Sequence, residues 1–342
     1  MIWTTWRQHR AEAAVGAVIL AALAAAMLVV GSIARDRAHA LGLPACTGTG
    51  SCGDALDRLH RDFHSLPPFT FALIAVPLLA GMFWAAPLVS REYEAGTHRL
   101  AWTQSVSPLR WITTKITLIF GVLAAASLLL GLLANWTFDP LTPAFGGRYN
   151  STWYDIQGVV PVACMLFALA VGVAASALIR RTIPAMALTV LAYAAARIPV
   201  HWIRWRFAPL TADTRSVPLS TLQQQPTGSP NDLAGSALPP GASLRSATVT
   251  DSFGHPIPTS KGNFDLLRQY CPNLQIDASR SRVLNPGACV ARVQNLTLHQ
   301  MTTYQPASHF WFIQAVESTI FISLAALLVA AAVFAVTRRR PS

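Results

Sequence analysis

The chain has 342 residues, of which 53% are hydrophobic and 12% are charged, and its mean hydropathy is +0.41. A soluble domain carries about 25% charged residues, so this share is too small for a surface that faces water everywhere. The apolar residues also stand in long blocks, as they do in membrane-spanning helices. The composition therefore excludes an ordinary soluble protein and indicates one that crosses a membrane.

The formal net charge of +11 would suit nucleic-acid binding, but its distribution argues against that function. The segments that we predict to be cytoplasmic hold eleven basic residues and three acidic ones, and therefore eight of the eleven net charges. Lys and Arg gather in this way on the cytoplasmic side of membrane proteins, so we predict no nucleic-acid partner. The residues counted are Arg7, Arg10, Arg91, Arg99, Arg110, Lys115, Arg180, Arg181, Arg338, Arg339, Arg340, Glu12, Glu92 and Glu94.

The apolar stretches predict six spans, with both ends of the chain in the cytoplasm. Residues 1–12 form a basic, aromatic segment that suits the inner leaflet, and the apolar stretch after it is longer than the core of a cleaved signal peptide. A short helix is expected at 54–63. His60 in this helix and His64 directly after it have a metal-binding spacing that is usually incidental, so we predict no metal site. The spans are placed at 13–33, 69–89, 116–135, 156–179, 184–200 and 310–336.

The expected fold is an all-α membrane protein of six transmembrane helices with one large extracellular region. Pro, Ser, Thr and Gly dominate residues 207–260 of that region, which predicts loop or linker there. The predicted domains are the amphipathic segment 1–12, spans one to five over 13–200 with a cytoplasmic segment at 90–115, the extracellular region 201–309, and span six with its basic tail over 310–342.

Four of the five cysteines fall in regions that we predict to be extracellular, where disulfides persist. One outside loop holds two of them, and the large region between spans five and six holds the other two. We interpret them as two disulfides, and a zinc site is the alternative, although no pair has the C-x-x-C spacing. The four residues are Cys46, Cys52, Cys271 and Cys289.

The sequence contains no G-x-x-x-x-G-K-[ST] phosphate loop and no G-x-S-x-G or H-E-x-x-H motif. We therefore predict no ATP site, no cofactor and no catalytic residue in this chain. The most informative segment is cytoplasmic, at 90–115: charged residues come first, Gly96-Thr97 opens an amphipathic stretch, and Ser107-Pro108 restarts a helix. Such a segment could receive a push from a soluble partner, or it could be an ordinary amphipathic loop at the lipid headgroups.

These residues resemble a known family. The run Arg91-Glu92-x-Glu94-x-Gly96-Thr97, followed by Ser107-x-x-Arg110 and Lys115, is similar to the loop between spans two and three of ABC exporter permeases. The class is the drug- and polysaccharide-exporting one that shares its fold with the G-subfamily transporters. The opening Trp3-x-x-Trp6-Arg7-Gln8-His9-Arg10 and the segment Pro77-Leu78-Leu79-Ala80-Gly81-Met82-Phe83-Trp84 resemble actinobacterial members.

The resemblance implies a permease subunit in the cell membrane of a bacterium. Such a subunit pairs with itself or a close relative, contacts membrane lipid, and docks two ABC ATP-binding subunits that hold ATP and magnesium. It would export an amphipathic drug, peptide or lipid. The residues expected at the ATPase are Arg91, Glu92, Glu94, Gly96, Thr97, Arg99 and Trp102.

Three polar residues lie near the outer ends of spans five and six. Arg197, Gln314 and Glu317 could pair or line a translocation path or outer gate, because charged groups at that depth usually face a partner or cavity. Alternatively, Arg197 snorkels and Glu317 sits at headgroup level. Two other functions stay open: a membrane-anchored sensor or immunity protein that binds a ligand outside, and an intramembrane enzyme that uses Arg197, His201 and Glu317.

Overall fold

The computed structural model divides the chain into two compact units, a helical unit of Met1–Phe207 with Phe310–Ser342 and a second unit of Ala208–His309. Each unit is described by itself. The residues that the structure describes are 2–45, 52–96, 107–218, 238–239, 241–250, 256–257, 275–277, 282–283 and 297–338.

Within these residues, the helical unit has six segments that are long and apolar enough to cross a membrane, as predicted. From Ile2 the backbone runs on into the first span as one helix, and the amphipathic, cytoplasmic character of residues 1–12 stays a prediction. The six segments are α1 (Ile2–Ala40), α3 (Pro67–Ala80) with η2 (Gly81–Ala85) and α4 (Pro87–Glu94), α6 (Pro108–Phe138), α7 (Val160–Ile179), α8 (Thr182–Ile203) and α13 (Phe310–Arg338).

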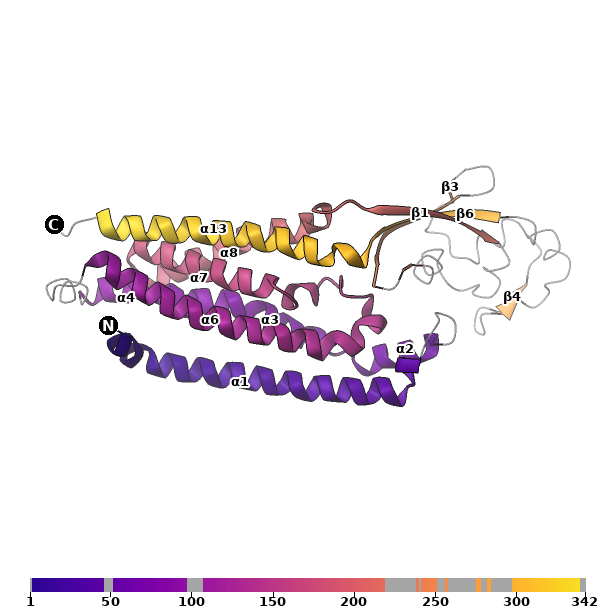
Figure 1. Ribbon diagram of the computed structural model, residues 1–342, viewed down its shortest axis with the longest axis horizontal. Helices are drawn as coiled ribbons and strands as arrows, with labels where there is room; N and C mark the ends of the chain where they lie inside the picture. The colour runs from indigo at the N-terminus through magenta and orange to yellow at the C-terminus, as the bar shows by residue number, and fades with distance from the viewer. Residues whose placement is uncertain are drawn as a thin grey trace. The chain divides into compact units, whose positions relative to one another are not determined.

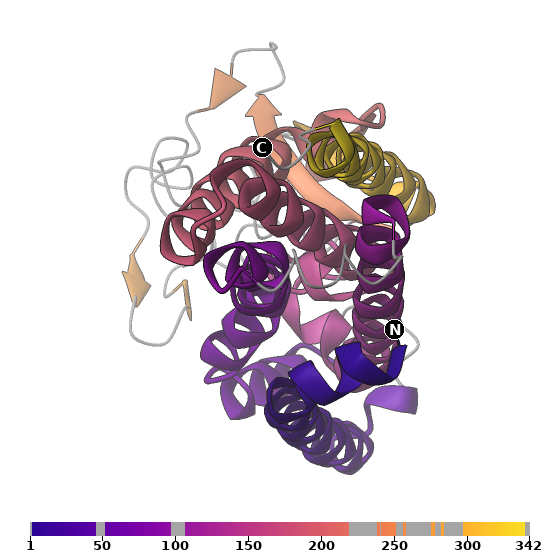
Figure 2. The ribbon, with the colours of Figure 1, turned by 90° about the vertical axis from the view of Figure 1, so that its left-hand side faces the viewer.

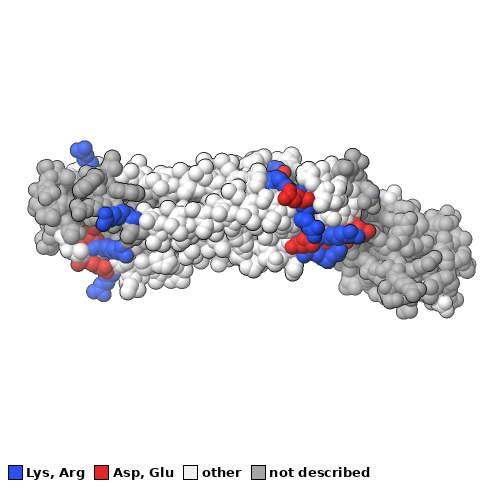
Figure 3. Space-filling view, turned by 90° about the horizontal axis from the view of Figure 1, so that it is seen from below, with Lys and Arg blue, Asp and Glu red and all other residues white. Residues whose placement is uncertain are grey.

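The start of α1 and the end of α13 lie at the same end of the helical unit, which we call the terminal end (Figure 1). The opposite end, which we call the loop end, carries α2 (Gly53–Asp62), η3 (Asp139–Phe145) and η4 (Tyr154–Ile156). The short helix expected at 54–63 is thus confirmed. On the face shown in Figure 3, charged side chains gather toward the two ends and leave an uncharged stretch between them, as a bilayer core requires.

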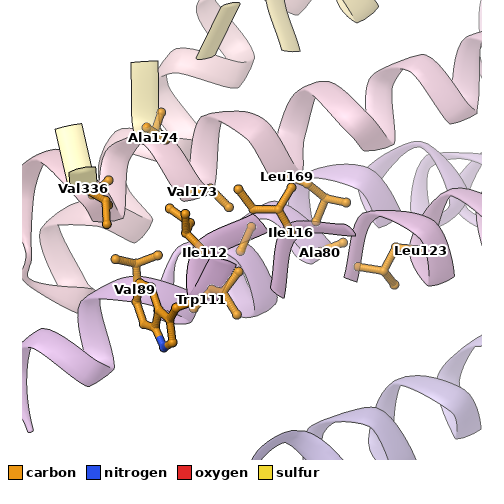
Figure 4. Close-up of a cluster of buried hydrophobic side chains, with 14 of the residues drawn as sticks. Ala80, Val89, Trp111, Ile112, Ile116, Leu123, Leu169, Val173, Ala174 and Val336 are labelled. Atoms are coloured by element: carbon orange, nitrogen blue, oxygen red, sulfur yellow. The ribbon is translucent and has the colours of Figure 1, made fainter. Parts of the chain in front are cut away.

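The central helix is α7. It contacts α3, α4, α6, α8 and α13. In an apolar stretch of 18 residues, 78% of α7 is buried, compared with 11% of the corresponding stretch of α1. Seen end-on in Figure 2, α1 lies at the border of the unit. Near the terminal end, four helices bury a common cluster of apolar side chains (Figure 4). Its members include Val89 of α4, Trp111 and Ile112 of α6, Val173 of α7 and Val336 of α13.

Two glycines bring α7 against the second span with backbone touching backbone. A Cβ placed at Gly81 would lie 2.6 Å from the carbonyl oxygen of Ala168, and one placed at Gly172 would lie 2.5 Å from that of Gly81. Small residues permit such close approach in membrane helices. The second span has a π-helical turn at this point, η2, which is a local widening of the helix that is common at functional sites.

The second unit is a β-structure, so the all-α prediction is wrong for this part of the chain. A four-stranded antiparallel sheet has the order β1-β6-β2-β3, and β4 pairs with β5. Three of its strands, β1, β2 and β3, fall inside the stretch expected to be loop, because β1 and β2 pair along the distant β6 and β3 pairs with β2. The strands are β1 (Thr211–Pro218), β2 (Ser243–Thr250), β3 (Pro256–Ile257), β4 (Ile276–Asp277), β5 (Arg282–Val283) and β6 (Thr297–Gln305).

The two expected disulfides stay predictions. Cys46, Cys271 and Cys289 lie outside the described residues. The fourth cysteine of the predicted disulfides, Cys52, is buried at the start of α2. Cys164 is a buried free thiol within α7.

The α7–η2 contact gives a test of the packing. We expect Gly172→Ala to lower the free energy of unfolding by about 1–3 kcal/mol, because the added methyl group overlaps the backbone of η2. The matched control is Gly121→Ala on α6, where an added Cβ meets nothing within 4 Å and alanine is the better helix former. Thermal unfolding in detergent should show a lower Tm for the first variant only. Equal Tm values would contradict the close approach.

Candidate functional site

At the terminal end, an ion pair joins the second span to the third. Glu92 of α4 contacts Lys115 of α6 through Oε1 and Nζ. Both side chains are largely buried, at 14% and 5% exposed. The Lys115 ammonium also lies 4.6 Å from the ring centroid of Trp111, one helical turn earlier. Since a buried charge without a partner is very costly, this pair holds the end of α4 against the start of α6.

Glu94 joins the same segment to the fifth span. Its Oε1 accepts a hydrogen bond from the backbone N–H of Thr182 at 2.9 Å, and its Oε2 accepts one from the Thr182 hydroxyl at 2.8 Å. Ser90 Oγ lies 3.0 Å from that hydroxyl oxygen. Thr182 is the first residue of α8, whose first N–H groups lack partners within the helix. The Glu94 carboxylate therefore caps α8 from a neighbouring helix.

Two turns with positive φ shape this region. Gly96 has φ +69° directly after α4 and donates its N–H to the carbonyl of Tyr93, which is the usual role of glycine at a helix C-terminus. Arg180 has φ +59° and ends α7, a conformation that is uncommon outside glycine. Its guanidinium lies 4.7 Å from the ring centroid of Tyr93, so the turn between α7 and α8 is held against α4.

We call Glu92, Glu94, Lys115 and Thr182 the α4–α6–α8 junction. Of the seven residues predicted to contact an ATPase, Glu92 is largely buried against Lys115, Glu94 is exposed and binds Thr182, Arg91 is exposed, and Gly96 forms the turn. Thr97, Arg99 and Trp102 lie outside the described residues. The motif thus lies beside a point where three spans meet, a fact that the sequence could not show because α8 starts nearly ninety residues after α4 ends.

A second cluster of charges lies at the loop end. Asp155 of η4 accepts hydrogen bonds from Arg197 Nη2 of α8, at 2.6 Å, and from Arg204 Nη1 of η5 (Arg204–Arg206). His201 Nδ1 lies 3.2 Å from its other oxygen. Arg197 Nη1 contacts Glu317 Oε1 of α13. We call these five residues the charge cluster.

The charge cluster is removed from solvent. The side chains of Glu317 and Arg204 are 0% exposed and that of Asp155 is 6% exposed. Burial by itself raises the pKa of Asp155. The hydrogen bond with His201 and the charges of Arg197 and Arg204 outweigh that effect and hold the pKa below its ordinary value of 3.8. Each buried charge has an opposite one within contact, which is the condition for charges to persist in an apolar bundle.

The structure decides between the two arrangements considered for the outer charges. Arg197 and Glu317 pair, so Arg197 does not snorkel and Glu317 does not lie at the surface. Gln314 is also buried, but it binds the chain before α7: its Oε1 accepts from the N–H of Val159 at 2.9 Å, and its Nε2 donates to the carbonyl of Gln157 at 3.1 Å. All three predicted residues therefore tie α13 to its neighbours.

Sequence reasoning missed Asp155 and Arg204. In the sequence, Asp155 is an acidic residue in a short loop and Arg204 is a basic residue after a span. Neither feature indicates which residue forms the ion pair. A family model described as ABC-2 membrane transporter related matches residues 17–204. The chain belongs to this family. No match is found among curated proteins or solved structures.

The ABC-2 family and the six apolar helices make the chain the permease subunit of a transporter and a multi-pass membrane protein. The matched residues run from α1 to the start of η5 and therefore include the α4–α6–α8 junction and four members of the charge cluster. Glu317 and the second unit lie beyond the match. An ABC-2 permease implies an ATP-binding partner in general.

Asp155 gives a test of the charge cluster. We expect Asp155→Asn to lower the free energy of unfolding by about 3–5 kcal/mol, because the change leaves Arg204 and Arg197 buried without a full counter-charge. The matched control is Asp139→Asn, whose ion pair with Arg148 is exposed and should be worth no more than about 1 kcal/mol. Thermal unfolding in detergent measures both.

The same variants predict a pH dependence. Because the pKa of Asp155 is lower in the folded state, its stabilisation is complete above the unfolded value, near 3.8, and is lost as pH falls below that value toward the folded pKa. The Tm difference between wild type and Asp155→Asn should therefore stay constant from pH 8 to about pH 5 and shrink in more acidic buffer. A difference that grew on acidification would contradict the lowered pKa.

Proposed function

We propose that this permease drives ATP-powered export of an amphipathic compound through the cell membrane, together with two ABC ATP-binding subunits and a second permease, most simply another copy of this chain. ATP and magnesium bind in the ATPase, and this chain supplies no catalytic residue. The observation that carries the proposal is the α4–α6–α8 junction beside the family-like segment.

The α4–α6–α8 junction is suited to transmit a displacement to three helices of the bundle. Residues 97–106 connect α4 to α6, so any displacement of that connection acts on both helix ends at once. The buried pair of Glu92 and Lys115 makes α4 and α6 move together, and Glu94 carries the motion to the first turn of α8. A docked ATPase that moved this connection would therefore tilt three spans. The basic residues at the terminal end support a cytoplasmic location for it by the positive-inside bias.

The charge cluster is suited to be the outer gate. It joins α8 to α13 at the loop end, opposite the junction. Glu317 Oε2 and Arg204 Nε are buried without a hydrogen-bond partner among the described residues, so this arrangement leaves polar atoms of the charge cluster unsatisfied. A second arrangement that gave this oxygen a partner would offset part of the cost of separating Arg197 from Glu317. Export, rather than import, rests on the resemblance to exporter permeases.

The experiment is an affinity purification of the tagged chain from its native membrane, followed by mass spectrometry and an ATPase assay. We expect a subunit with a phosphate loop to be recovered. Glu94→Gln should keep the complex assembled but lower its ATPase rate about tenfold or more, because the cap on α8 weakens. The matched control is Asp57→Asn on α2, an exposed acidic residue at the loop end.

Two outcomes are decisive. An ATPase whose rate falls with Glu94→Gln but not with Asp57→Asn supports coupling through the junction. Recovery of the intact chain without any ATPase, in several mild detergents, contradicts the transporter proposal and favours a membrane-anchored sensor whose second unit binds a ligand.

A further inference from the structure

An apolar cavity of about 570 Å³ opens between α1, the second span and α6. Its volume falls within the range of about 300–1,000 Å³ that is usual for small-molecule sites. The walls are apolar side chains from the three segments, among them Ile19 and Leu20 of α1, Phe83 and Trp84 of η2, and Leu123 and Ala126 of α6. The cavity does not touch the charge cluster, so it is separate from the proposed outer gate.

The cavity exists because of how α1 and η2 are held. In the second half of α1 one face is buried, with Met27 and Ala34 at 0% exposed. Val15 and Val18 in the first half are mostly exposed. One contact fixes that first half: Gly16 receives the ring of Trp84, and a Cβ at Gly16 would overlap it. The opposite face of η2 is pressed on α7 through Gly81. The π-helical turn is therefore fixed on one face and lines the cavity with the other.

One end of the cavity carries charge. Arg91 is the single charged residue among the described residues that line it, and Ser127 is the single hydroxyl. Arg91 directly follows the buried residues 87–90 of α4 and is exposed. An apolar chamber with one guanidinium matches a molecule with one apolar tail and one anionic head, such as a carboxylate, sulfate or phosphate, which arginine binds through paired N–H donors.

We propose that this cavity is the entry site for the transported substrate and that the substrate is a single-tailed anionic amphiphile. The tail lies between α1, η2 and α6, and the head lies at Arg91. This assignment rests on the proposed function and adds a substrate class and a place to it. A ligand held at Arg91 lies beside Glu92 in the chain, so occupancy acts directly on the α4–α6–α8 junction. Binding should therefore stimulate ATP hydrolysis.

The test uses the whole transporter, purified with its ATPase and placed in phosphatidylcholine nanodiscs. Two photoactivatable probes with the same 16-carbon chain are compared, one with a carboxylate head and one with an alcohol head. Labelled positions are mapped by peptide mass spectrometry, and ATPase rates are measured with each probe. We expect the acid to label cavity residues at least fivefold more than the alcohol does, and the acid alone to raise the ATPase rate.

Two variants and their controls locate the site. Arg91→Gln should abolish the preference for the acid, whereas Arg338→Gln, an exposed arginine at the same end outside the cavity, should keep it. Ala126→Phe fills the cavity and should suppress labelling by both probes. Ala125→Phe changes the neighbouring exposed position, which does not line the cavity, and should leave labelling unchanged. Since Arg91 is exposed, its variant reports on binding even if the phenylalanine variant fails to fold.

Each outcome is decisive. Equal labelling by acid and alcohol, or labelling spread over lipid-facing positions such as Leu129, overturns the site. Labelling that phosphatidylglycerol in the nanodisc removes, with no change in ATPase rate, identifies a bound membrane lipid and overturns the substrate assignment. An active ATPase complex without cavity labelling overturns the site and leaves the proposed function standing. Cavity labelling in a chain that recruits no ATPase overturns the proposed function, and the substrate assignment with it.

Discussion

A charge buried in an apolar bundle must meet an opposite charge, and this constraint fixes where the helices of this permease join. At the terminal end, Lys115 is nearly inaccessible and pairs with Glu92. At the loop end, Asp155 receives Arg197 and Arg204, and Arg197 also binds Glu317. Apolar contacts alone give membrane helices little preference for one neighbour over another, because lipid tails are as apolar as leucine. The ion pairs supply that preference at both ends.

The sequence predicted what depends on local composition and missed what depends on distant pairing. Apolar blocks located the six spans, and a short amphipathic run located α2. Asp155 could not be assigned, because its partner Arg204 lies 49 residues away and nothing in the loop sequence names it. The strands of the second unit were missed for the same reason: β1 pairs with β6, whose residues follow some eighty positions later. Hydropathy indicates whether a segment prefers a lipid environment. It does not indicate which other segment of the chain will pack against that segment.

The site residues show the same limit in a different form. The family-like motif predicts contacts with a partner, and the structure shows contacts of the same residues within the chain: Glu92 pairs with Lys115, and the exposed Glu94 accepts hydrogen bonds from Thr182. A sequence pattern records which residue types a segment needs, and an ion pair across two helices needs the same types as a contact with another protein. Only the positions of α6 and α8 distinguish the two.

The two points where the chain leaves and re-enters the helical unit share one aromatic cluster at the loop end. The chain leaves the helical unit after Phe207 and returns at Phe310. Beside these points, Trp205 and Phe310 each lie between 5.6 and 5.7 Å from the rings of both Tyr149 and Tyr154, measured between ring centroids. Both connections therefore start from one aromatic cluster, next to Arg204 and Asp155. The cluster thus lies where α8 and η5 end and α13 begins, and α8 and α13 are the two helices that the Arg197–Glu317 pair holds together.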